Sequence, residues 1–261
     1  MQVKSMSHAI ILALGVLAAQ ATYAAPVRTL FLGADRELPE VMKEIVLTDP
    51  AQRFDAAASA TLSATNRAPT LDYLKQFDSV LLWTNERPGD AVGLGDVLAD
   101  YVDAGGLVVR ATFVGTHMPN AGRIGGSDYA AFAQGGRYAY GGACLGSYDA
   151  GSAIMAGVRS LCATSFNGDW APSLNAGATL VASWDNGAPL VGINAKRNVI
   201  DISLFPNFAD YSHAIGDYRR LFANALTLDE TPAAVVPEPD SIALLGLGLL
   251  GIGALLRRRQ S

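Results

Sequence analysis

Buried-strand and amphipathic-helix patterns alternate along the first half of this chain. Residues 27–33 and 79–84 are short, almost continuously apolar runs, which are typical of strands buried on both faces. Residues 38–46 and 94–102 instead repeat their apolar side chains at helical spacing, and another apolar run follows at 107–114. Strands that alternate with helices of this length predict an α/β fold, built as a three-layer, doubly wound and mostly parallel sheet.

The second half of the body predicts three more strands and a closing helix. The strands are expected at 178–184, 190–194 and 199–205. A tight turn at Asp185-Asn186-Gly187 joins the first two of them. Residues 215–225 form the closing helix, and a shorter helix, capped by Thr70, precedes the strand at 79–84.

Residues 115–151, between these halves, have no periodicity and are rich in glycine and tyrosine. A non-periodic segment of this length is usually functional or poorly ordered. Tyrosine offers a flat apolar ring with a polar rim, which suits the edges of sugar rings. Tyr138 and Tyr140 are therefore candidate carbohydrate-binding residues, although such rings equally well cover a sheet edge. The same interpretation applies to Tyr129, Phe132 and Tyr148.

The N-terminus has the layout of a secretory signal peptide, with Lys4, an apolar run over 9–19 and the small residues Ala21, Thr22, Ala24 and Ala25. We expect export through the Sec machinery and cleavage by signal peptidase after Ala24. An uncleaved anchor is the alternative, but it needs about 20 apolar residues, and this run is shorter.

The C-terminus has three parts in a fixed order. Val236-Pro237-Glu238-Pro239 comes first, an uncharged stretch over 241–256 follows, and Arg257, Arg258 and Arg259 close it. A helix over 241–256 would be about 24 Å long, which suits a membrane helix that is strained or transient. The arginines keep the C-terminus in the cytoplasm, so the body lies outside it.

This order resembles the PEP-CTERM sorting domain, assigned here to residues 236–261. The resemblance implies recognition by an exosortase in the inner membrane of a Gram-negative, exopolysaccharide-producing bacterium. Processing near Pro237-Glu238-Pro239 and delivery to the outer surface or extracellular matrix would follow. A plain tail anchor is the alternative.

The same tail contains a G-x-G-x-x-G pattern at Gly246, Gly248 and Gly251. A dinucleotide-binding fingerprint must follow a strand and precede an acidic residue by about 20 positions, and here the sequence ends first. The glycines instead allow close packing of a membrane helix. We expect no cofactor.

Composition limits what the body can bind. Residues 25–229 form the expected domain and 230–235 a linker, and together they carry a net charge of about −7, which disfavours nucleic acid as a partner. With His8 removed, only His117 and His213 remain, which excludes a multi-histidine metal site. Cys144 and Cys162 are the only cysteines, and in an oxidising compartment they predict a disulfide.

The body resembles the class I glutamine amidotransferase-like superfamily, nearest its ThuA-like branch. The segments that carry the likeness are QFDSVLLWTN, LGDVLADYVDAGGLVVRATF, SAIMAGV and APLVGINAKRNVIDISLFP. The resemblance implies a flavodoxin-like layered sheet and, in catalytic members, a cysteine at the turn after the strand at 107–114. Here residues 111–115 read Ala-Thr-Phe-Val-Gly, so the thiol chemistry is not carried over.

His117 is the candidate counterpart of a histidine that ThuA-like proteins often keep near this strand. Together with Asp35 and Asp185 it would form a polar cluster, although an ordinary loop histidine is the plainer interpretation. His213, beside Asp210 and Asp217, is expected to cap a helix or form surface pairs. We therefore expect a non-enzymatic envelope or matrix protein that binds exopolysaccharide, with a ThuA-like carbohydrate enzyme and a protein-docking module as alternatives.

Overall fold

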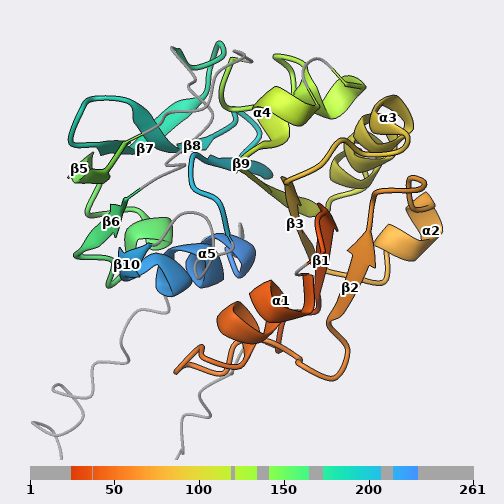
Figure 1. The fold of residues 1–261 in the computed structure, drawn as a ribbon, viewed down its shortest axis with the longest axis horizontal. Helices are drawn as coiled ribbons and strands as arrows, with labels where there is room; N and C mark the ends of the chain where they lie inside the picture. Colours follow the sequence, from red (N-terminus) through yellow and green to blue (C-terminus); the bar gives the residue numbers. More distant parts are fainter. Residues whose placement is uncertain are drawn as a thin grey trace, which may run out of the picture.

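The computed structural model of this chain describes residues 25–36, 38–118, 121–133, 141–164, 173–206 and 214–228. A single ten-stranded sheet runs through these residues, with helices on both of its faces (Figure 1). The signal peptide, the candidate residues Tyr138 and Tyr140, His213, and the tail with its expected membrane helix lie outside the described residues.

The first half of the sheet is parallel. Its strands are β1 (Thr29–Ala34), β2 (Ala60–Ser63), β3 (Ser79–Thr84), β4 (Leu107–Ala111) and β9 (Val199–Ile202). They lie in the order β2-β1-β3-β4-β9, and every neighbouring pair is parallel. This is the flavodoxin-like order, in which the direction of chain progression reverses between β1 and β3.

The second half of the sheet is antiparallel, so the prediction of a mostly parallel sheet was wrong for this part. Its strands are β5 (Ala143–Tyr148), β6 (Leu161–Ala163), β7 (Thr179–Trp184), β8 (Pro189–Ile193) and β10 (Ile215–Gly216). They extend the sheet beyond β9 in the order β8-β7-β5-β6-β10, antiparallel at each step. The physical reason is the connections: parallel neighbours need a crossover of a dozen or more residues, whereas β7 and β8 are joined by the short turn at 185–188.

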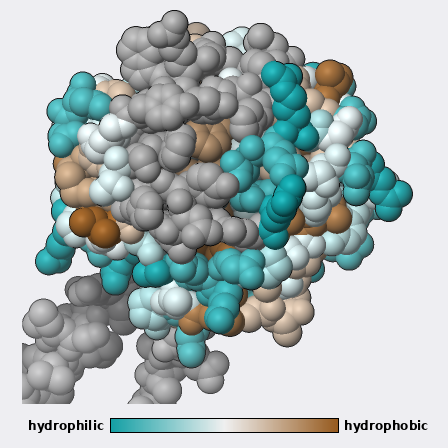
Figure 2. Space-filling model, viewed as in Figure 1, coloured by the Kyte–Doolittle hydropathy of each residue, from teal (hydrophilic) through white to brown (hydrophobic). Residues whose placement is uncertain are grey.

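Helices cover the two faces of the sheet, which confirms the three-layer arrangement. α1 (Leu38–Val46) and α5 (Tyr218–Leu226) bury their apolar sides in the core on one face. α2 (Leu71–Leu74) and α3 (Ala91–Asp103) do so on the other. The remaining short elements are α4 (Val114–His117) and the 3-10 turns η1 (Arg123–Gly125) and η2 (Ala153–Met155). In the view of Figure 2, hydrophobic residues of the described part lie as separate patches among hydrophilic ones.

The predicted helix over 38–46 and the predicted strand over 79–84 match α1 and β3. The predicted strand over 107–114 ends earlier, at Ala111, because α4 begins three residues later. Residues 115–151 are not wholly irregular, since they include most of α4, all of η1 and the strand β5. Thr70 caps α2, with its side-chain oxygen accepting a hydrogen bond from the backbone N–H of Tyr73.

Cys144 and Cys162 are joined by a disulfide in the structure. The two residues lie directly opposite each other on β5 and β6, so the bond links neighbouring strands at the antiparallel end of the sheet. Of the described helices, none combines the length and the apolar character that crossing a membrane requires.

Replacing both cysteines with alanine (C144A/C162A) is expected to destabilise the body by about 3 kcal/mol, because the bond closes a loop of 18 residues. Urea unfolding of residues 25–235 under oxidising conditions measures the change. A reducing agent should lower the midpoint of the wild type and leave that of the variant unchanged. Equal midpoints for the oxidised wild type and the variant would contradict a stabilising disulfide.

Candidate functional site

Buried polar residues mark the carboxyl ends of neighbouring parallel strands. Asp35 follows β1, Thr84 ends β3 and Thr112 follows β4, and each of the three is at most 5% exposed. Sheets of this kind bind their ligands in the crevice outside the carboxyl ends of the strands, where the strand order reverses. This carboxyl edge is therefore the candidate functional site.

Asp35 is held by two hydrogen bonds. The indole Nε1 of Trp83 donates to Asp35 Oδ2 at 2.8 Å, and the backbone N–H of Arg36 donates to Oδ1 at 2.7 Å. The carboxylate thus ties the end of β1 to the neighbouring strand β3. Because each oxygen accepts a hydrogen bond, the orientation of the Asp35 carboxylate at this edge is fixed.

Thr84 and Thr112 lie next to each other on β3 and β4. The backbone N–H of Phe113 donates to the carbonyl oxygen of Thr84 at 3.1 Å, which continues the pairing of the two strands by one step. Neither threonine Oγ1 has a hydrogen-bond partner among the described residues, although both atoms are buried. A buried hydroxyl without a partner costs free energy, so this position favours an ordered water or a polar ligand atom.

A buried ion pair lies beneath the same edge. Arg110 on β4 and Asp201 on β9 are register partners, with 3.4 Å between Arg110 Nε and Asp201 Oδ1, and neither is more than 5% exposed. Burial raises the pKa of the Asp201 carboxyl, and the nearby guanidinium opposes that rise. Two charges taken this far out of water need further polar partners to offset the cost.

Those further partners come from the segment 121–133, which follows α4. Arg110 Nη1 donates to the carbonyl oxygen of Ile124 at 3.0 Å, and the backbone N–H of Phe132 donates to Asp201 Oδ2 at 2.8 Å. The Phe132 ring packs on Gly192 of β8, where a Cβ would lie 2.4 Å from the ring. The ion pair therefore fixes segment 121–133 over the sheet from the inside.

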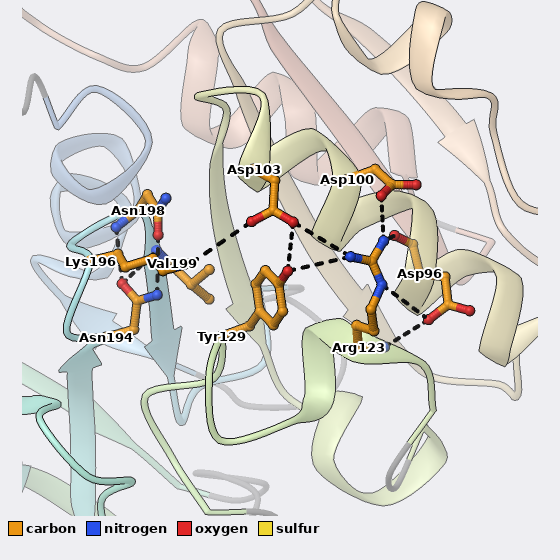
Figure 3. Close-up of polar contacts among 9 residues, drawn as sticks. All are labelled: Asp96, Asp100, Asp103, Arg123, Tyr129, Asn194, Lys196, Asn198 and Val199. Carbon is orange, nitrogen blue, oxygen red and sulfur yellow. Dashed lines mark hydrogen bonds and ion pairs between the residues drawn. The ribbon is translucent and has the colours of Figure 1, made fainter.

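A second network fastens the same segment from the outside (Figure 3). Asp96, Asp100 and Asp103 lie four and three residues apart on α3, so they share one face of the helix, and all three approach the Arg123 guanidinium. The Tyr129 hydroxyl donates to Asp103 Oδ2 at 2.6 Å, and this hydrogen bond raises the pKa of Tyr129.

Lys196, from the turn before β9, completes this outer network. Its Nζ lies 3.8 Å from Asp103 Oδ1 and 5.4 Å from the centre of the Tyr129 ring. The backbones of α3 and segment 121–133 are in close contact beside this network. A Cβ on Gly95 would lie only 2.1 Å from the Ala121 carbonyl oxygen. Exposed ion pairs contribute little individually, but several acidic and basic partners converging on one loop fix its position.

The structure does not bring Asp35, His117 and Asp185 into one cluster. Asp185 follows β7, five strand positions from β1, which separates it from Asp35 by about 24 Å across the sheet. His117 ends α4, next to β4, but its side chain lies outside the described part. The predicted triad was wrong because sequence order does not reveal strand order.

The aromatic residues of the Gly/Tyr-rich segment 115–151 lie in different surroundings. Phe132 is buried against β8, and Tyr129 is tied to Asp103 and Lys196. Tyr148 is 40% exposed but ends β5, which runs antiparallel to β7 and so points to the opposite edge of the sheet. No group of three metal-binding side chains occurs among the described residues.

Sequence reasoning missed the pair Arg110–Asp201, although a signal was present. The apolar runs LVVRA and VIDI each contain one charged residue, of opposite sign, inside an otherwise fully buried strand. A buried charge needs a partner, so the two strands could have been predicted as neighbours.

Removing one member of this pair is expected to be costly. Asp201→Ala leaves the Arg110 guanidinium buried without its counter-charge, which should destabilise the body by about 3–5 kcal/mol in urea unfolding. Asp185→Ala is the matched control, because that aspartate is exposed at the same edge and its loss should change stability by less than about 0.5 kcal/mol. The double variant R110M/D201L should cost less than the sum of R110M and D201L, and strictly additive costs would refute coupling between the two residues.

Three comparisons with known proteins show which proteins and motifs this chain resembles. Residues 235–259 match the PEP-CTERM protein-sorting motif, which confirms the predicted sorting signal. No curated protein matches the chain. A ThuA-like protein from Bacteroides uniformis ATCC 8492 has a similar structure, with a TM-score of 0.53 and 14% identity over 79% of this chain and 93% of that one.

A GMP synthase-type protein from Thermoplasma acidophilum is also similar, with a TM-score of 0.51 and 12% identity over 78% of this chain and 94% of that one. At these identities the likeness concerns the fold alone. The chain is therefore an exported protein with a C-terminal PEP-CTERM motif for exosortase processing, whose body has the fold of ThuA-like and glutamine amidotransferase-like proteins.

Proposed function

We propose that this chain is a non-enzymatic protein of the cell envelope or extracellular matrix. Its amidotransferase-like body has lost the catalytic thiol of that superfamily and serves as a binding domain for exopolysaccharide. Signal peptidase removes residues 1–24, the apolar stretch 241–256 holds the intermediate in the inner membrane, and an exosortase acts near Pro237-Glu238-Pro239. The processed body then reaches the outer surface or matrix.

The observation that carries this proposal is the residue content of the turn after β4. The resemblance to amidotransferases calls for a cysteine there, and this chain has Thr112 and Phe113. Both cysteines of the chain are joined to each other on β5 and β6, so no other thiol is available. A thiolate nucleophile needs a free, partly exposed cysteine, and this body offers none.

A ThuA-like enzyme acting on a carbohydrate is the alternative. What supports it is that α4 follows β4 in the chain and ends at His117, and that the buried hydroxyls of Thr84 and Thr112 have no partner among the described residues. In this version His117 and a carboxylate exchange protons with a sugar. A third role, as a docking module for another envelope protein, predicts neither sugar binding nor turnover.

Replacing His117 with alanine separates the first two proposals. Residues 25–235 and their H117A variant are tested for binding and cleavage of the exopolysaccharide of the producing bacterium. We expect binding by both, cleavage by neither and no difference between them. His213→Ala is the control, since it removes the other histidine of the body. Turnover by the wild type that H117A abolishes would overturn the non-enzymatic proposal, and absence of both binding and cleavage would favour docking.

The tyrosines Tyr138 and Tyr140 are proposed to provide the sugar-stacking rings. The variant Y138A/Y140A should weaken exopolysaccharide binding by about 0.5–1.5 kcal/mol for each stacking ring removed, measured by calorimetric titration. Tyr148→Ala is the matched control, because it removes an exposed tyrosine of the same Gly/Tyr-rich segment 115–151. An equal loss in Y148A would place the sugar elsewhere, and no loss in Y138A/Y140A would exclude the two rings.

A further inference from the structure

The two ends of the described body lie together at the amino edge of the sheet, where the parallel strands begin. The backbone N–H of Val27, just before β1, donates to the carbonyl oxygen of Arg53 at 2.8 Å. The guanidinium Nη1 of Arg53 donates to Thr227 Oγ1, just after α5, at 3.0 Å. One residue therefore bridges the entry and the exit of the domain.

A second observation places the exit at the same edge. Leu228 lines a cavity of about 370 Å³ together with Thr179, Ile193 and Arg197. Thr179 begins β7, Ile193 ends β8 and Arg197 lies in the turn before β9. Because β8 runs antiparallel to both β7 and β9, all three residues lie at the amino edge.

We propose that this amino edge is the membrane-facing side of the protein while the sorting tail is attached, and that the carboxyl edge with Asp35, Thr84 and Thr112 points away from the lipid. The inference rests on the proposed function in one respect, namely that residues 241–256 hold the tail in the membrane. In this orientation the amino edge meets the lipid surface and the carboxyl edge remains open to soluble ligands.

Chain length decides the orientation. Ser241 follows Leu228 by 13 residues. With Pro232, Pro237 and Pro239 in it, a chain of that length reaches about 40 Å in the polyproline II conformation and at most about 45 Å when fully extended. A body of about 200 residues has a radius of gyration of about 17 Å and is about 40 Å across. Turning the carboxyl edge to the lipid would need a tether drawn along the whole body at almost full extension, which costs conformational entropy.

Energy transfer from a fluorophore on the body to acceptor-labelled lipid headgroups tests this orientation. The full chain is reconstituted in phosphatidylethanolamine–phosphatidylglycerol vesicles, with one maleimide fluorophore at either Ala57→Cys or Arg87→Cys. Ala57 is exposed at the amino edge, before β2, and Arg87 is exposed at the carboxyl edge, after β3. The native cysteines do not react, because they form a disulfide.

We expect several-fold greater transfer from the A57C label than from the R87C label. A chain that ends at residue 235 is the control and should show no transfer from either position. Equal or reversed transfer in vesicle-bound chains overturns the orientation and leaves membrane attachment intact. A flotation assay distinguishes a wrong orientation from a failure of membrane attachment. If the full chains do not float with the vesicles, both the orientation and the proposed membrane-held intermediate are overturned.

Discussion

The buried ion pair between Arg110 and Asp201 joins three parts of this body that would otherwise be held by separate contacts. It links β4 to β9, the last parallel strand before the sheet becomes antiparallel. It also binds the backbone of segment 121–133 at two points, Ile124 and Phe132. Two apolar side chains of similar size would hold the strands at least as well, because burying charges is costly. Apolar side chains could not donate or accept the two backbone hydrogen bonds, so the charges specify where segment 121–133 lies.

The parts of the fold that could be predicted from the sequence are those in which one residue pattern determines one structure. β3 has the predicted bounds and α1 lies where its apolar stripe predicts a helix, because helical spacing in one case and a short apolar run in the other favour one type of element. β2, β5, β6 and β10 were missed for a shared reason. β2, β6 and β10 are short and β5 is partly exposed, so their sequences lack the alternation or the apolar run that signals a strand. Pairing with neighbouring strands, rather than their own composition, makes them strands.

The candidate site shows the same limit at the level of topology. Asp35 was placed correctly at a carboxyl end, because position after a strand can be read along the chain. Its distance from Asp185 could not be read, since that depends on the order of the strands that lie between β1 and β7. The pairing of Arg110 with Asp201 could have been predicted from the sequence. Opposite charges inside two buried strands restrict which strands can be neighbours.

The position of the two cysteines in the sheet bears on the proposal that this body has no thiol chemistry. Sheet order places β5, with Cys144, four strand positions from β4, or about 19 Å from the turn at Thr112. Reducing the disulfide would therefore free two thiols at the far, antiparallel end of the sheet, and neither could act at the turn after β4. The Thr112 hydroxyl is not accessible as a replacement, because this residue is only 1% exposed. In the described residues, the carboxyl edge therefore carries the doubly hydrogen-bonded Asp35 carboxylate and the buried, unpartnered hydroxyls of Thr84 and Thr112.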